Sequence, residues 1–271
     1  MKRKRKIPLV VLSDVHLGTY GCQAKELLQY LKSIQPKMLV LNGDIIDMWS
    51  FSKSYFPAAH MNVLRQIIKM SNQGTRVIYI TGNHDEALRK YSDFILGNFE
   101  LADKLILELD GKKTWIFHGD VFDSSTKGYA KIVAKLGGKG YDLLILINSF
   151  INWVLVLLGK EKRSYSKIIK DSVKKAVSFV SNFETTAAEI AIQKKYSYVV
   201  CGHIHKPQMK EVENEHGKVM YLNSGDWVEN LTALEYKKEK WSIYKYNKAD
   251  YLHHDNNEDK IVNDIITKIL S

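Results

Sequence analysis

Short apolar runs that end in polar residues restrict the fold of this chain more than any other feature of its sequence. Six runs rich in Val, Ile and Tyr occupy residues 9–12, 38–41, 77–80, 115–117, 198–200 and 219–222. Runs of this length and composition are typical of strands buried on both faces. Segments 25–33 and 62–71, which separate the early runs, carry apolar residues at helical spacing. The alternation predicts an α/β fold with functional side chains at the carboxyl ends of the strands.

The alternation of short apolar runs with helical segments stops between about residue 121 and residue 195. A long apolar run there is followed by a segment in which apolar residues recur with the spacing of an amphipathic helix. Farther on, segments 231–236 and 241–246 have the pattern of an antiparallel pair. The sequence therefore predicts a main domain of residues 1–120 and 196–247, a helical cap insertion at 121–195, and a C-terminal tail with a short helix at 248–271.

Composition limits the class of protein. A chain of 271 residues with 45% hydrophobic content can bury one α/β core and a modest insertion. The formal net charge of +10 favours an anionic partner: a phosphorylated substrate, an anionic membrane surface or nucleic acid. Cys22 and Cys201 are the only cysteines. Their spacing fits neither a disulfide framework nor a zinc knuckle, and no export signal is visible, so we expect reduced thiols in a cytoplasmic protein.

Metal-binding side chains follow five of the predicted strands. The blocks are Asp14-Val15-His16, Gly43-Asp44-Ile45-Ile46-Asp47, Gly82-Asn83-His84-Asp85, His118-Gly119-Asp120 and Gly202-His203-Ile204-His205. Carboxylate, imidazole and amide groups bind manganese, iron and zinc. In an extended backbone alternate residues point the same way, so we expect Asp14 and His16 to reach one ion. His203 and His205 repeat this spacing.

Each block taken alone has an ordinary structural interpretation. A single Asp-x-His pair is usually a satisfied loop contact, Gly-Asn-His-Asp is often just a turn, and His118 at a strand end would more often be structural. Five such blocks in this order, each at the end of a predicted strand, are not expected by accident. Together they predict a metal centre.

At these blocks the sequence resembles the calcineurin-like metallophosphoesterase family, with every block of the family pattern present. The resemblance implies a sandwich of two mixed β-sheets flanked by helices, and two divalent metal ions, most often manganese, with iron or zinc as alternatives. It implies that Asp44 bridges the ions. The implied ligands are Asp14, His16, Asp44 and His205 for one ion, and Asp44, Asn83, His118 and His203 for the other.

The resemblance also implies roles in catalysis. Metal-bound water would attack the phosphorus atom, and Asn83 would belong to the catalytic set as well as to the ligands. His84 is expected to stabilise the transition state or protonate the leaving oxygen, with Asp85 orienting its ring. Asp47 and Asp120 are candidates for supporting the ligand histidines. An ordinary structural hydrogen bond is an equal alternative for these two.

A narrower resemblance, to the UDP-2,3-diacylglucosamine pyrophosphohydrolase branch, lies in segments 13–18, 202–207 and 223–229. That branch cleaves a nucleotide-sugar pyrophosphate in lipid A synthesis, giving lipid X and UMP, at the cytoplasmic face of the inner membrane. Its helical insertion binds acyl chains. The chain departs from the branch at His84, where the branch carries Arg, so a sister group with another lipid or nucleotide substrate is an alternative.

The predicted insertion carries further expectations. Its apolar run at 141–158 has a basic flank, which suits docking on an anionic bilayer, although packing on the core is an equal alternative. A membrane crossing is disfavoured because it would separate His118 from His203. Candidate substrate contacts are Asp123, Tyr129, Lys167, Lys170, Lys174 and Lys175. A solvated charged face is the plainer interpretation of these lysines.

Two other functions fit part of the pattern. A nuclease or cyclic-nucleotide phosphodiesterase would suit the positive charge, but the sequence has no basic patch interleaved with aromatic residues for base stacking. A non-catalytic binding scaffold would be expected to have lost metal ligands. Because every expected ligand is present, the sequence favours an enzyme.

Overall fold

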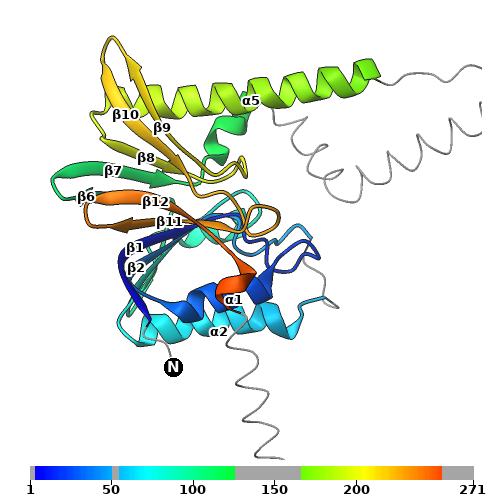
Figure 1. Ribbon diagram of the computed structural model, residues 1–271, viewed down its shortest axis with the longest axis vertical. Helices are drawn as coiled ribbons and strands as arrows, with labels where there is room; N and C mark the ends of the chain where they lie inside the picture. The colour runs from blue at the N-terminus through cyan, green and yellow to red at the C-terminus, as the bar shows by residue number, and fades with distance from the viewer. Residues whose placement is uncertain (1–3, 51–54, 126–165, 252–271) are drawn as a thin grey trace, which may run out of the picture.

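The computed structural model describes residues 4–50, 55–125 and 166–251, and in the long helix α5 it describes most side chains only from Asn182 onward. The described chain forms two mixed β-sheets packed face to face (Figure 1). Helices α1 and α2 cover the outer face of the first sheet, and α5 lies against the outer face of the second (Figure 1). This arrangement confirms the predicted sandwich of two mixed sheets flanked by helices.

The first sheet has the strand order β12-β11-β1-β2-β3-β5-β4. Neighbours among β1, β2, β3 and β5 are parallel, while β11, β12 and β4 are antiparallel to their neighbours. The strands are β1 (Arg5–Leu12), β2 (Ile34–Asn42), β3 (Arg76–Ile80), β4 (Ile95–Leu96), β5 (Phe99–Ala102), β11 (Thr232–Lys237) and β12 (Lys240–Lys245).

The second sheet has the order β6-β7-β8-β10-β9. Its central strands β7, β8 and β10 are parallel, and the two outer strands are antiparallel to them. The strands are β6 (Lys104–Leu109), β7 (Lys112–Phe117), β8 (Tyr198–Cys201), β9 (Gln208–Asn214) and β10 (Gly217–Asn223).

Burial on both faces explains the continuous apolar runs. In β1, Val10 and Leu12 face the helices α1 (Ala24–Ser33) and α2 (Ala58–Asn72), whereas Leu9 and Val11 face the second sheet. Alternate residues of one strand thus enter different layers of the core, and both must be apolar. The six predicted strands and the two early helices are all present.

The strands that the sequence analysis missed lie at or near sheet edges. In β6, exposed and half-buried residues alternate, and its short apolar run at 105–107 lies between charged residues. Strand β4 has only two residues, and both are exposed. Such strands pair through their backbones, and their side chains give little signal.

Helix α5 (Ser166–Gln193) is the predicted amphipathic helix. Near its C-terminal end, Phe183, Ala187 and Ala191 pack on the second sheet, so this part of the predicted insertion also belongs to the sandwich core. The apolar run at 141–158 and the helix expected at 260–270 lie outside the described residues. The division into domain, cap and tail stays a prediction.

One partly buried ionic contact ties β1 to β11 and α1. Both terminal nitrogens of Arg5 lie 2.9 Å from the carboxylate oxygens of Glu235, which also accepts a hydrogen bond of 2.9 Å from the hydroxyl of Tyr30. Tyr30 is fully buried, and this carboxylate replaces the hydrogen bond that its hydroxyl would make to water.

We expect Glu235→Ala to lower the free energy of unfolding by about 1–3 kcal/mol, because the Tyr30 hydroxyl loses its acceptor. Urea unfolding followed by circular dichroism measures the change. Glu108→Ala, at an exposed position of β6, is the matched control and should change stability by less than about 0.5 kcal/mol. Equal losses in the two variants would contradict the interpretation.

Candidate metal centre

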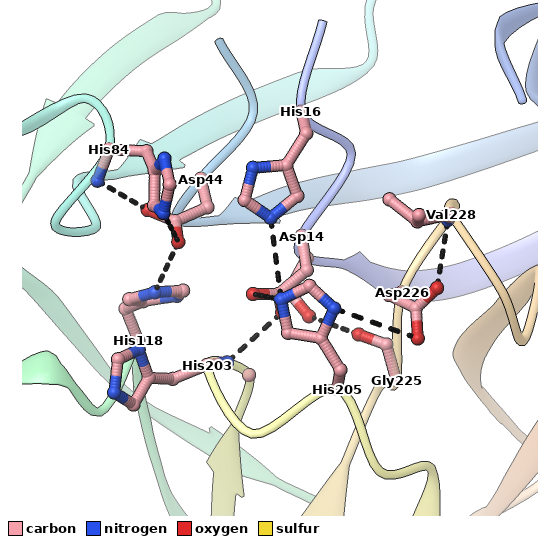
Figure 2. Close-up of polar contacts among 12 residues, drawn as sticks. Asp14, His16, Asp44, His84, His118, His203, His205, Gly225, Asp226 and Val228 are labelled. Carbon is pink, nitrogen blue, oxygen red and sulfur yellow. Dashed lines mark hydrogen bonds and ion pairs between the residues drawn. The ribbon is translucent and has the colours of Figure 1, made fainter. Parts of the chain in front are cut away.

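The five polar blocks meet where strands of both sheets end. Asp14 and His16 follow β1, Asp44 follows β2 and His84 follows β3, all in the first sheet. The blocks of the second sheet follow β7 and β8. Figure 2 shows the side chains of the five blocks turned toward one another. Residues far apart in sequence thus form one cluster, as the sequence predicted.

The backbone at the ligand positions differs from the expected extended form. Five residues have φ in the left-handed region: Asp14 (52°), His16 (54°), Asp44 (54°), His203 (67°) and His205 (54°). The common direction of Asp14 and His16 therefore comes from two left-handed residues and not from the alternation of a strand. Such backbone costs about 1–3 kcal/mol for each residue and persists only where the surroundings fix it.

Backbone hydrogen bonds between the first two loops fix it here. Asp14 N donates to Gly43 O at 3.1 Å, and His16 N donates to Asp44 O at 2.9 Å. Beyond the ligands, Leu17 N donates to Ile45 O at 2.8 Å. The loops after β1 and β2 are thereby joined into one rigid unit that carries two carboxylates and an imidazole.

Each carboxylate is held by one oxygen and presents the other to the cluster. Asp14 Oδ2 accepts a hydrogen bond from His203 N at 3.0 Å, and Asp44 Oδ1 accepts one from His84 N at 2.8 Å. The remaining oxygens face imidazoles: Asp14 Oδ1 lies 3.2 Å from His205 Nε2, and Asp44 Oδ2 lies 3.3 Å from His118 Nε2. Figure 2 marks these contacts.

Polar contacts on the far side of the rings indicate which nitrogen is left to bind a metal. His118 Nδ1 donates to the carbonyl of Asn42 at 2.8 Å, so its Nε2 is the free ligand atom. His16 Nδ1 lies 3.3 Å from Asp47 Oδ2, and His205 Nδ1 lies 3.9 Å from Asp226 Oδ2. In these three histidines Nε2 points to the cluster. Asp226 and the Asn42 carbonyl are supports that the sequence analysis missed, since neither gives a signal beyond its residue type.

The donor set fits divalent metal ions. Asp14 Oδ1, Asn83 Oδ1 and His118 Nε2 are buried and lack a hydrogen-bond partner among the described residues. Asp14 Oδ1 and His118 Nε2 nevertheless lie close to groups of opposite charge. Buried polar atoms in such numbers need a partner, and a cation between them would supply it. The ligand atoms of Asp14, His16 and His205 lie within 4.8 Å of one another, as do those of Asp44, His118 and His203.

These two groups agree with the two ligand sets that the sequence suggested. A third group, His16, Asp44 and His84, joins them. The ligand assignment itself remains a proposal.

Three glycines make room for the cluster. A Cβ atom at Gly43 would lie 2.2 Å from His118 Nδ1, and one at Gly82 would lie 2.3 Å from Asp44 Oδ1. At Gly202 it would lie 2.7 Å from Asp14 Oδ2. The glycines of the motifs are therefore required by the close approach of backbone to ligand side chains.

Opposite charges shift the pKa values of the cluster. Burial raises the pKa of Asp14, but the facing His205 lowers it more, to about 2. Burial lowers the pKa of His205, whereas Asp14 raises it, to about 9. Burial also lowers the pKa of His118, but Asp44 raises it well above its usual value. Before metal binding these imidazoles hold protons at neutral pH, which a metal must displace.

The structure corrects the role expected for Asp85. Its carboxylate accepts hydrogen bonds from Gly82 N at 2.6 Å, Ile45 N at 2.9 Å and the Tyr79 hydroxyl at 2.6 Å. It therefore ties the loop after β3 to the loop after β2. The ring of His84 instead lies against Asp47, with Nδ1 at 2.9 Å from Oδ2.

Asp47 and Asp120 also differ from each other. Asp47 contacts the rings of both His16 and His84, which agrees with the predicted support. Asp120 accepts a hydrogen bond of 2.9 Å from Arg89 and so links the loop after β7 to the 3-10 helix η1 (Glu86–Tyr91). For Asp120 the structural alternative is the better interpretation.

The structure does not describe the side chains of the candidate substrate contacts. Tyr129 lies outside the described residues, and Asp123 is described only as backbone of the short 3-10 helix η2 (Asp120–Ser125). The lysines at 167, 170, 174 and 175 lie on α5, in the part whose side chains are not described. Among the described helices, none is long and apolar enough to cross a membrane.

We expect Gly82→Ala to weaken metal binding by about 10–100-fold, because the added methyl group displaces the Asp44 carboxylate. Metal content after dialysis, measured by mass spectrometry, gives the loss. Gly111→Ala is the control: its φ of 75° is unfavourable for Ala, but no atom lies within 4 Å of the added carbon. That variant should lose stability and keep its metal.

The affinity for Mn²⁺ should rise with pH. Because His205 has a pKa of about 9 before metal binding, each proton that the metal displaces makes the apparent Kd fall about tenfold for each pH unit between 6.5 and 8.5. Asp14 contributes nothing in this range, since its pKa is about 2. Titration calorimetry measures the slope, which His205→Asn should make shallower. A Kd independent of pH would count against the assignment.

Comparison with known proteins agrees with this geometry. A family model described as calcineurin-like phosphoesterase matches residues 7–207. A UDP-2,3-diacylglucosamine hydrolase of Neisseria gonorrhoeae is 27% identical over 84% of this chain and 92% of its own length. One from Aliivibrio fischeri is 22% identical over 88% of this chain and 98% of its own.

Solved structures give more distant matches. A novel archaeal phosphodiesterase is 14% identical, with a TM-score of 0.44, over 88% of this chain and 98% of its own. A dimetal phosphatase from Danio rerio is 11% identical, with a TM-score of 0.41, over 88% of this chain and 95% of its own. The assignment rests on the family model, which matches most of the chain. This chain belongs to the calcineurin-like phosphoesterase family and is a metal-dependent phosphoesterase.

Proposed function

We propose that this phosphoesterase hydrolyses the pyrophosphate bond of UDP-2,3-diacylglucosamine, giving UMP and the diacylated sugar 1-phosphate, lipid X. The observation that best supports hydrolysis is the pair of carboxylates, Asp14 and Asp44. Each presents one oxygen to imidazoles at about 3 Å. The named substrate is supported by relatives that carry this name and are similar over more than four-fifths of the chain.

Two ions would be held by the side chains that the structure brings together. Asp14, His16 and His205 would hold one, and His118, His203 and Asn83 the other, with Asp44 between them. When bound, such ions lower the pKa of water and neutralise charge on the phosphoryl oxygens. Mixed oxygen and nitrogen donors suit manganese, and also iron or zinc.

His84 supplies positive charge beside the ligands. Burial lowers the pKa of His84, but Asp47 and Asp44 raise it above its usual value. Its Nδ1 faces Asp47 at 2.9 Å, while Nε2 lies 4.0 Å from Asp44 Oδ2 and so faces the cluster. A protonated His84 can donate a hydrogen bond to the oxygen that leaves phosphorus, where negative charge develops.

This role accommodates the departure at position 84. Where the lipid A enzymes carry Arg, this chain carries an imidazole whose pKa is raised by two carboxylates. Both side chains offer a cationic donor to a phosphate oxygen. The imidazole is shorter, and it depends on Asp47 for its charge.

The remaining expectations form part of the same proposal. A substrate with two acyl chains resides in a bilayer, so the enzyme would act at the cytoplasmic face of the inner membrane as a peripheral protein. The formal charge of +10 favours an anionic lipid surface. The membrane contact assigned to the run at 141–158 lies outside the described residues.

The decisive assay measures UMP release from UDP-2,3-diacylglucosamine in mixed micelles by the manganese-loaded protein. We expect rapid release, lost by at least about 100-fold in His118→Ala because a ligand is removed. His216→Ala is the matched control: this exposed histidine lies on the turn between β9 and β10 and should have no effect.

A generic diester, bis(p-nitrophenyl) phosphate, tests the phosphoesterase activity separately from the named substrate. Hydrolysis of this ester without UMP release would remove the named substrate and favour a nuclease or cyclic-nucleotide phosphodiesterase. If His118→Ala kept both activities, the result would contradict the metal centre itself.

A further inference from the structure

Three consecutive residues after β2 contact His84, each in a different way. Asp47 Oδ2 lies 2.9 Å from the ring nitrogen Nδ1, and Met48 N donates to the backbone carbonyl of His84 at 3.0 Å. The indole of Trp49 lies on the imidazole, with ring centroids 4.1 Å apart and planes tilted by 35°. One short turn therefore holds both the backbone and the ring of this histidine.

The turn is itself fixed to the metal-binding loops. Asp47 N donates to Leu17 O at 2.9 Å, and Asp47 Oδ1 accepts a hydrogen bond of 2.7 Å from Ser50 N. On its other side, the His84 ring meets His16 edge-on, with centroids 4.7 Å apart. The imidazole is thus confined between a metal-ligand candidate and an indole, and it cannot rotate without losing one of these contacts.

Core packing does not explain the position of Trp49. Its side chain is 45% exposed, and it does not belong to the buried clusters of the described core. An exposed indole beside a polar cluster gains little from burial, whereas stacking on an imidazole is favourable, more so when the imidazole is charged. The contact with His84 therefore explains why Trp49 lies at this position.

We infer that Trp49 is a positioning residue, which holds the His84 ring so that Nε2 faces the metal cluster. This inference rests on the role proposed for His84. Without the indole, the ring keeps its contact with Asp47 but gains freedom to turn toward solvent. A donor that is correctly placed for less of the time slows the chemical step and leaves substrate binding unchanged.

Kinetics with the generic diester tests the role. We expect Trp49→Ala to lower kcat about tenfold with KM unchanged, and Trp49→Phe, which keeps an aromatic face, to restore most of it. Tyr91→Ala is the matched control, since Tyr91 is also an exposed aromatic residue (54%) and contacts Lys90. Metal content and Tm should be the same in all three variants, because Trp49 is half exposed.

A double-mutant cycle separates positioning from direct contact with substrate. In a His84→Ala background, Trp49→Ala should cause no further loss, because the group on which it acts is gone. A further loss of the same size, or a rise in KM, would overturn the inference and make Trp49 a substrate contact.

A spectroscopic readout keeps the inference independent of the reaction. In the zinc-loaded protein, the carbon-bound ring protons of His84 should be shifted upfield by the indole, and Trp49→Ala should remove this shift while His216 is unaffected. An unchanged spectrum would show that Trp49 does not hold the ring. If His84→Ala retained full kcat, the role proposed for His84 would fail, and the ring shift alone would then decide whether Trp49 positions it.

Discussion

The site depends on two buried carboxylates, each of which contacts a backbone amide with one oxygen and a histidine ring with the other. Asp14 Oδ2 accepts the amide of His203, which links the first sheet to the loop after β8 in the second, and Asp44 Oδ1 accepts the amide of His84 within the first sheet. Burial of an ionised carboxylate is costly, and it is offset only where hydrogen bonds and opposite charges surround the group. Both carboxylates therefore act as fixed points: one oxygen fixes a loop, and the other attracts the histidines.

The sandwich brings these points together, and α5 supports them from outside. A Cβ atom at Gly119 would lie 2.5 Å from the ring of Phe183, whose centroid is 6.0 Å from that of His203. The next residue of the helix, Glu184, pairs with Lys206 at 2.9 Å, and Lys206 directly follows His205 in the chain. The helix that leads out of the predicted insertion thus packs directly behind the loop that carries two ligand histidines. Substrate contacts made by the insertion would bear on the metal centre through this packing.

The sequence predicted what depends on residue type and order. Strands buried on both faces need continuous apolar runs, and a metal centre at their ends needs carboxylates and imidazoles, so both could be inferred. Backbone conformation and partner choice could not. The left-handed φ of Asp14 is set by hydrogen bonds to the loop of Asp44, a tertiary contact. The family resemblance suggested Asp85 as the group that orients His84. The Gly82 and Ile45 amides occupy Asp85, however, and Asp47 contacts the His84 ring. Edge strands such as β4, which has only two residues and both exposed, gave no run long enough to detect.

The order of the blocks along the chain has a consequence for synthesis. In two of the candidate ligand groups, residues of the first two loops meet histidines of the loop after β8: Asp14 is grouped with His205, and Asp44 with His203. A nascent polypeptide can complete neither group until residue 205 has left the ribosome and β8 has joined its sheet. Until then, Asp14 lacks His205, the imidazole that faces its free oxygen. If these residues are the ligands, metal uptake would require that the two sheets have already come together.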